Sequence, residues 1–221
     1  NYQKKMEYDY GEGITLDGIF LDNSMGKYQD SPFYQLIDTE GKHAEAIEYS
    51  NSVDPALDYY NDRVQTLNSI SSIMKGKLFL INKGSAPYFP TEYLDFVNGI
   101  VSEDYLSQIA WKGYLDNYYL PQRDILRNKN KLHLIQCAED SDIIFCLTYY
   151  YLIFNNDLEF FGVSGDKWFA ALGYDIGAPN GDFNLYSSID DPSCIGKKSY
   201  IYSRDYYNAL IILRLPDYGC K

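Results

Sequence analysis

Histidine and tryptophan are scarce in this chain, with two residues of each type among 221. The four cysteines form no Cys-x-x-Cys pair, so the spacing of a structural zinc site is missing. The short motifs of serine hydrolases, zinc proteases, P-loop enzymes and dinucleotide-binding enzymes are also missing. These absences predict a protein that uses no metal and no other cofactor.

Basic residues are few: 19 Lys and Arg stand against 31 Asp and Glu, for a formal net charge of −12. Nucleic acids and anionic membrane surfaces are both bound through Lys and Arg. The longest apolar stretch, residues 143–154, is interrupted by Thr148 and is too short to span a bilayer. We therefore expect no nucleic-acid partner and no membrane-spanning segment.

The chain is 46% hydrophobic and contains 24 tyrosines, enough for one sizeable core. Tyrosine rings suit sugar stacking, but most are expected to be ordinary core or surface residues. Cys137 and Cys146 lie in apolar segments and are expected as buried free thiols. Cys194 and Cys220 lie in loop-like segments, and their pairing in an exported chain is left open. His133, inside an apolar segment, is expected as a core residue rather than a base.

Apolar runs that end in a polar residue alternate with helical patterns along residues 1–165. Strands that alternate with helices favour parallel β/α units, and about five are present where a (β/α)8 barrel has eight. We predict an α/β fold: a TIM barrel truncated to its last five units, with the first three upstream of Asn1. Residues 166–221 predict an irregular segment and a β-hairpin that closes or flanks the barrel. The expected strands cover residues 18–22, 77–82, 96–103, 131–137 and 159–163, and the expected helices cover residues 54–75, 121–130 and 140–154.

Two carboxylates follow apolar strands at equivalent places, Asp22 after residues 19–21 and Glu103 after residues 96–101. A (β/α) barrel holds its chemistry at the C-terminal ends of its strands. Hydrolysis of a glycosidic bond needs two carboxyl groups, one as acid and one as nucleophile or base. Asp22 and Glu103 are therefore the predicted catalytic pair. The alternatives are that Asp22 caps a loop and that Glu103 enters a helix.

Further polar and aromatic side chains near strand ends are candidates for holding a sugar. Asparagines would hydrogen-bond sugar hydroxyls, aromatic rings would stack on the sugar, and an acid ends the fourth strand. The alternatives are turn-forming asparagines, core aromatics and a helix cap. The predicted substrate-binding residues are Asn23, Asn82, Trp111, Tyr114 and Glu139.

Three segments resemble one known family. Residues 16–23 resemble its "DGvFlDN" strand, residues 172–179 its "dlGkP" segment, and residues 204–212 its "R-x-F-x-N-G-l-v-l-v-N-P" ending. The family comprises TIM-barrel glycosidases, hypothetical glycosyl hydrolases near the endo-alpha-1,4-polygalactosaminidase-like enzymes. The resemblance implies that Asp22 is a catalytic carboxylate on the fourth barrel strand and Glu103 its partner on the sixth. The chain departs from the pattern in having Ala209 for Gly and an Arg-Leu-Pro sequence for Asn-Pro.

The sequence therefore predicts a glycoside hydrolase that acts on a polysaccharide or glycan through two carboxylates, secreted or at the cell surface. One alternative is a non-catalytic carbohydrate-binding or cell-surface protein on a degenerate barrel. Another is a fragment without a function of its own, whose open half-barrel exposes strand edges and apolar surface.

Overall fold

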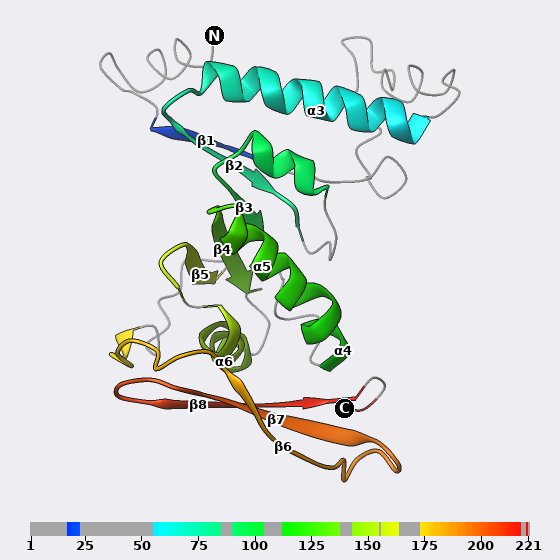
Figure 1. Ribbon diagram of the computed structural model, residues 1–221, viewed down its shortest axis with the longest axis vertical. Helices are drawn as coiled ribbons and strands as arrows, with labels where there is room; N and C mark the ends of the chain where they lie inside the picture. The colour runs from blue at the N-terminus through cyan, green and yellow to red at the C-terminus, as the bar shows by residue number, and fades with distance from the viewer. Residues whose placement is uncertain are drawn as a thin grey trace. The chain divides into compact units, whose positions relative to one another are not determined.

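The computed structural model describes residues 17–22, 55–84, 90–103, 112–137, 143–154, 156–163, 173–217 and 220 (Figure 1). The chain forms two compact units. The first comprises residues 1–83 and 89–100, and the second comprises residues 84–88 and 101–221.

A parallel five-stranded sheet runs in the order β1-β2-β3-β4-β5, so the strand order follows the chain. Helical segments occur between successive strands, which confirms the predicted α/β class. The strands are β1 (Gly18–Leu21), β2 (Leu78–Asn82), β3 (Gly99–Ser102), β4 (Leu132–Cys137) and β5 (Glu159–Val163). The helical segments are α3 (Pro55–Ile73), η1 (Thr91–Asp95), α4 (Lys112–Tyr114), η2 (Leu115–Tyr119), α5 (Leu120–Asn128) and α6 (Ile143–Ile153).

In the first unit, β1 and β2 pair from Gly18 opposite Leu78 to Leu21 opposite Ile81. A Cβ at Gly18 would collide with the Leu78 carbonyl, so this close approach of two backbones requires glycine. Helix α3 follows the first strand in sequence and leads to Gly76, whose φ of +79° ends the segment before β2. The unit thereby places the C-terminal ends of β1 and β2 level with each other.

In the second unit, α6 lies between the β4–β5 strands and a separate antiparallel sheet (Figure 1). Its fully buried side chains include Tyr149 and Leu152. Because two sides of α6 are covered, its apolar residues are not confined to one stripe, and Ile144 is an apolar residue on the exposed side. The core cluster contains Leu115, Tyr119, Ile135, Cys137, Cys146, Leu147, Tyr149, Tyr150, Leu152, Ile153, Phe154, Tyr202, Leu213 and Leu215.

The antiparallel sheet has the order β6-β7-β8, with β6 (Asn184–Asp190), β7 (Lys198–Asp205) and β8 (Leu210–Pro216). The β7–β8 pair is the predicted hairpin, with Asp205 opposite Leu210 next to its turn. Strand β6 was not predicted, and the description of this part as irregular was wrong there. Six of its seven residues are exposed, so burial imposes no apolar alternation on its sequence.

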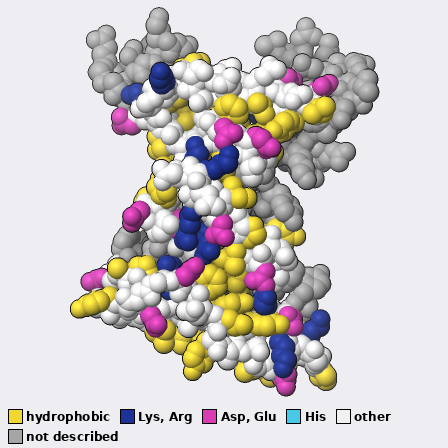
Figure 2. Space-filling model, viewed as in Figure 1, with side chains coloured by type: hydrophobic (Ala, Val, Ile, Leu, Met, Phe, Trp, Pro, Cys, Tyr) yellow, Lys and Arg dark blue, Asp and Glu magenta, His cyan; other side chains and the backbone are white. Residues whose placement is uncertain are grey.

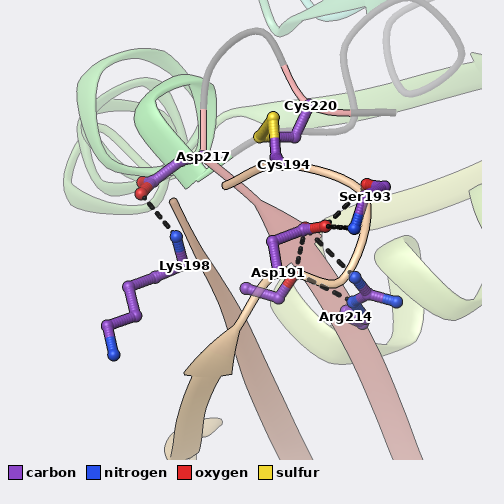
Figure 3. The surroundings of a disulfide bond; sticks show 8 residues. Asp191, Ser193, Cys194, Lys198, Arg214, Asp217 and Cys220 are labelled. Atoms are coloured by element: carbon purple, nitrogen blue, oxygen red, sulfur yellow. Dashed lines mark hydrogen bonds and ion pairs between the residues drawn. A yellow bond between two sulfur atoms is a disulfide. The ribbon is translucent and has the colours of Figure 1, made fainter. Parts of the chain in front are cut away.

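The turn between β6 and β7 is fastened to β8 through Asp191 (Figure 3). The Asp191 carboxylate accepts hydrogen bonds from the Ser193 backbone (2.8 Å), the Ser193 and Ser199 hydroxyls (2.6 and 2.5 Å) and Arg214 Nη2 (3.0 Å). These donors, those of Ser193 and Ser199 first, hold the pKa of Asp191 well below its usual range, because they favour the ionised form.

The C-terminal end of α6 is bound by side chains from two other elements. Arg204 Nη1, on β7, donates to the carbonyls of Tyr151 (3.1 Å) and Phe154 (3.3 Å). Arg127 on α5 donates to the Phe154 carbonyl (2.8 Å) and forms a bidentate ion pair with Glu159 (2.7 and 2.8 Å). Cations at this end donate to the last carbonyls of the helix, which have no partner within it. They also interact favourably with the negative end of the helix dipole.

Charges of both signs lie near one another on the face drawn in Figure 2, where Lys and Arg are dark blue and Asp and Glu magenta. Ion pairs within the second unit join Arg123 to Asp124 (2.9 Å) and Lys198 to Asp190 (2.7 Å). Acids outnumber bases in the sequence, and in the part of the chain that the structure describes Arg123 and Lys198 are paired with acids.

All four cysteines are paired. The prediction that Cys137 and Cys146 are free thiols was wrong: they form a disulfide with Cα atoms 6.2 Å apart. Cys137 ends β4 and Cys146 lies in α6, and the packing of helix on strand brings them within disulfide range. Cys194 and Cys220, whose pairing the sequence left open, also form a disulfide, with Cα atoms 5.7 Å apart.

We expect the native protein to contain no thiol that reacts with a thiol reagent, and four reactive thiols after denaturation with a reductant. Because the Cys194–Cys220 bond closes a loop of 26 residues, removing it with paired serines should lower the free energy of unfolding by about 3 kcal/mol. Thiol titration and urea unfolding measure both effects. Thiols that react in the folded, unreduced protein would contradict the pairing.

Candidate functional site

The structure brings together two of the predicted site residues, Asp22 and Asn82. Asp22 directly follows β1 and Asn82 is the last residue of β2. Because Leu21 pairs with Ile81, the next residues of the two strands lie level with each other. Asn82 Nδ2 donates a hydrogen bond of 2.6 Å to Asp22 Oδ1. Asp22 is exposed, whereas Asn82 is fully buried.

Lys83 follows Asn82 directly and was not among the predicted site residues, because it reads as the start of a loop. It is only 4% exposed. Burial lowers the pKa of the Lys83 ammonium to about 7, because desolvation disfavours the charged form. A lysine directly after a buried strand is the signal that could have marked it.

The buried Lys83 predicts a stability that rises with pH. Its folded-state pKa of about 7 lies below the unfolded value of about 10.4, so the unfolded chain binds more protons in this window. The free energy of unfolding should rise from pH 7 to pH 9, by at most about 1.4 kcal/mol per pH unit. Urea unfolding at pH 7, 8 and 9 measures this slope.

Substitution of Lys83 separates its contribution from that of other groups. Lys83→Met should flatten the slope, while Lys77→Met, at an exposed lysine before β2, should leave it intact. Burial raises the pKa of Tyr119 and Tyr150, but these tyrosines matter only above about pH 10, where the unfolded chain ionises. An unchanged slope in Lys83→Met would refute the assignment.

Glu103, the second predicted catalytic residue, follows β3 and is half-buried. The residue before it, Ser102, is fully buried, and its Oγ lies 2.8 Å from His133 Nε2. His133 is fully buried and meets the Phe154 ring edge to face at 5.4 Å, which confirms it as a core residue. Glu103 and Asp22 belong to different units, and their convergence on one substrate stays a prediction.

Tyr114 packs against other tyrosines. Its ring centroid is 4.5 Å from that of Tyr118 and 5.9 Å from that of Tyr119, and it lies against the core of the second unit. Its contact with a sugar stays a prediction. The other predicted substrate-binding residues, Asn23, Trp111 and Glu139, lie outside the described residues.

Residues 173–179 and 204–212, from the second and third segments that resemble the glycosidase family, contact each other in the structure. The Tyr207 backbone N–H donates to the Ala178 carbonyl and the Asn208 N–H to the Ile176 carbonyl, both at 3.0 Å. Gly177 has a φ of +74°, and a Cβ there would lie 2.7 Å from Tyr207 Cβ, so the contact requires glycine. Backbone hydrogen bonds therefore hold the two segments against each other.

Among the described residues, no group of three or more His, Cys, Asp or Glu is placed to hold a metal ion. No helix in the same part of the chain is long and apolar enough to cross a membrane. Comparison with protein-family models, with curated proteins and with solved structures found no match for this chain.

Proposed function

We propose that this protein is a glycoside hydrolase that cleaves a polysaccharide or glycan with Asp22 and Glu103 as its two carboxyl groups. The observation that carries the proposal is the exposed carboxylate of Asp22, held at the C-terminal end of a parallel strand by a buried amide of the neighbouring strand. This is the place where parallel α/β enzymes hold their reacting groups. Glu103 has the equivalent place after β3.

The proposed architecture is a (β/α)8 barrel in which β1 to β5 are the fourth to eighth strands. A strand order that follows the chain is the order a barrel needs. In the first unit, Phe20 is 49% exposed although its sheet partner Leu80 is buried, and Leu78, the partner of Gly18, is 41% exposed. Phe160 of β5 is 50% exposed. In a closed barrel, side chains on the inner face are packed, and three further strands would cover them.

The mechanism divides the work between the two carboxyl groups. One protonates the departing glycosidic oxygen, and the other attacks the anomeric carbon or activates a water molecule. A separation of about 5 Å would give retention of configuration, and about 6.5–9.5 Å would give inversion. The chemistry needs no metal or other cofactor.

The resemblance to TIM-barrel glycosidases supports the same proposal. It is carried by residues 16–23, 172–179 and 204–212, and Asp22 stands at the position of the family's acid. The two disulfides support a secreted or cell-surface location, since such bonds persist in oxidising compartments. A glycan outside the cell is the substrate class that fits both the resemblance to glycosidases and the location that the disulfides support.

The test is release of reducing ends from a panel of polysaccharides. The panel includes polygalactosamine, because the family that the sequence resembles lies near the polygalactosaminidase-like enzymes. Asp22→Asn and Glu103→Gln should each abolish most of the release while leaving the protein folded, as thermal unfolding would show. Wild-type release by both variants would overturn the assignment. Binding of a glycan without any release would instead favour a carbohydrate-binding protein.

A further inference from the structure

Asn82 was predicted to hydrogen-bond a sugar hydroxyl, and the structure gives its side chain a different use. Its amide is fully buried, so it offers no accessible surface to a ligand. Its Nδ2 donates instead to Oδ1 of Asp22 at 2.6 Å, a short hydrogen bond to a carboxylate. We propose that Asn82 is the positioning residue of Asp22, an inference that rests on the proposed function of Asp22.

Two features fix the donor in place. Asn82 is the last residue of β2, and its neighbours Ile81 and Lys83 are 0% and 4% exposed, so its backbone is held in packed surroundings. The pairing of Leu21 with Ile81 sets the register that brings residue 22 beside residue 82. The donor therefore belongs to the rigid sheet.

The acceptor lies on the exposed side of this pair. Asp22 is exposed and follows the end of its strand. A hydrogen bond from a fixed amide to one carboxylate oxygen selects one side-chain rotamer and one orientation of the carboxyl plane. A reacting group that is misplaced by about 1 Å loses about 10²-fold in rate, so this restraint bears directly on turnover.

A positioning role and a sugar-binding role predict different kinetics. If Asn82 acts through Asp22, Asn82→Ala should lower kcat by about 10- to 100-fold and leave KM within about 3-fold. If Asn82 binds the sugar, KM should rise while kcat is retained. Asn82→Asp keeps the shape of the side chain but removes the donor and adds a like charge, so it should lower kcat at least as much.

The matched control is Asn98→Ala. Asn98 Oδ1 accepts a hydrogen bond of 2.7 Å from the Phe79 backbone, at the other end of the same strand β2. Its loss removes an asparagine hydrogen bond from the same unit without touching Asp22. We expect a lower unfolding temperature and an unchanged kcat per folded molecule.

The kinetics are measured on the full chain with the polysaccharide that it cleaves, and a double-mutant cycle completes them. In the Asp22→Ala background, Asn82→Ala should cause no further loss of activity, because its effect passes through Asp22. A readout that needs no substrate is solvent exchange of the Asn82 side-chain amide protons by NMR. This exchange should accelerate in Asp22→Ala and stay unchanged in Asp17→Ala.

The outcomes separate the two proposals. Activity that Asp22→Asn abolishes but Asn82→Ala and Asn82→Asp leave intact would overturn the positioning role and retain the hydrolase. Amide exchange that is unchanged in Asp22→Ala would overturn the positioning role whatever the activity. Activity that is insensitive to Asp22→Asn would overturn the hydrolase proposal and the positioning role with it.

Discussion

Asp22→Asn is expected to lower kcat for glycan cleavage by about 10²- to 10⁴-fold, the range that a positioned acid–base group contributes. The substitution keeps the size of the side chain and removes the carboxylate. Because the new amide oxygen can still accept from Asn82 Nδ2, the loss of charge should lower the free energy of unfolding by no more than about 1.5 kcal/mol. Initial rates at saturating substrate, corrected for the folded fraction, measure the effect.

Asp17 provides the matched control for this prediction. It is an exposed acid at the opposite end of β1, and its backbone carbonyl, which accepts from the Leu78 N–H at 2.9 Å, survives the substitution. Asp17→Asn should therefore retain full kcat. Equal losses in Asp17→Asn and Asp22→Asn would point to the overall negative charge rather than to one catalytic carboxylate.

Arg204→Met is expected to lower the free energy of unfolding by about 2–4 kcal/mol. Arg204 is buried and donates to Gly181 (3.0 Å), Tyr151, Leu152 and Phe154 carbonyls. Methionine fills part of the space but removes this donor. The Tyr151 and Phe154 carbonyls keep the Tyr206 hydroxyl and Arg127 as donors, whereas a buried polar group left without a donor costs about 1–3 kcal/mol. Urea unfolding monitored by circular dichroism measures the loss.

A graded series tests whether geometry or charge carries this effect. Arg204→Lys keeps the charge but not the planar fork of donors, so it should lose an intermediate amount. Tyr206→Phe removes only the hydroxyl that donates to the Tyr151 carbonyl at 2.6 Å, so it should lose about 1 kcal/mol. An Arg204→Met protein as stable as the parent chain would refute the role of this contact in docking β7 on α6.

The regular elements of the two units could be predicted because their signals are local. The apolar run before Asp22 predicts β1, the run of residues 78–81 predicts β2, and Gly76 marks the boundary between α3 and β2. Strand β3 is shorter than expected, since residues 96–98 precede the ladder. The signal for β6 was absent because an exposed edge strand needs no alternation of apolar residues.

The candidate site was only partly readable from the sequence. The placement of Asp22 and Glu103 after apolar strands followed from position alone. The role of Asn82 did not, because an asparagine at a strand end reads equally well as a turn residue, a sugar ligand or a partner of another side chain. The burial of Lys83 was hidden as well, because a lysine after an apolar run reads as the start of a loop.

The amino-acid sequence by itself determined the α/β class, the strands that end in acids and the C-terminal hairpin, because apolar periodicity and turn residues act over a few neighbours. Only the tertiary structure decided which distant residues meet: Cys137 with Cys146, Asn82 with Asp22, and Arg204 with the end of α6. Such pairs depend on strand register and helix packing, which arise from the whole fold and leave no mark at either position.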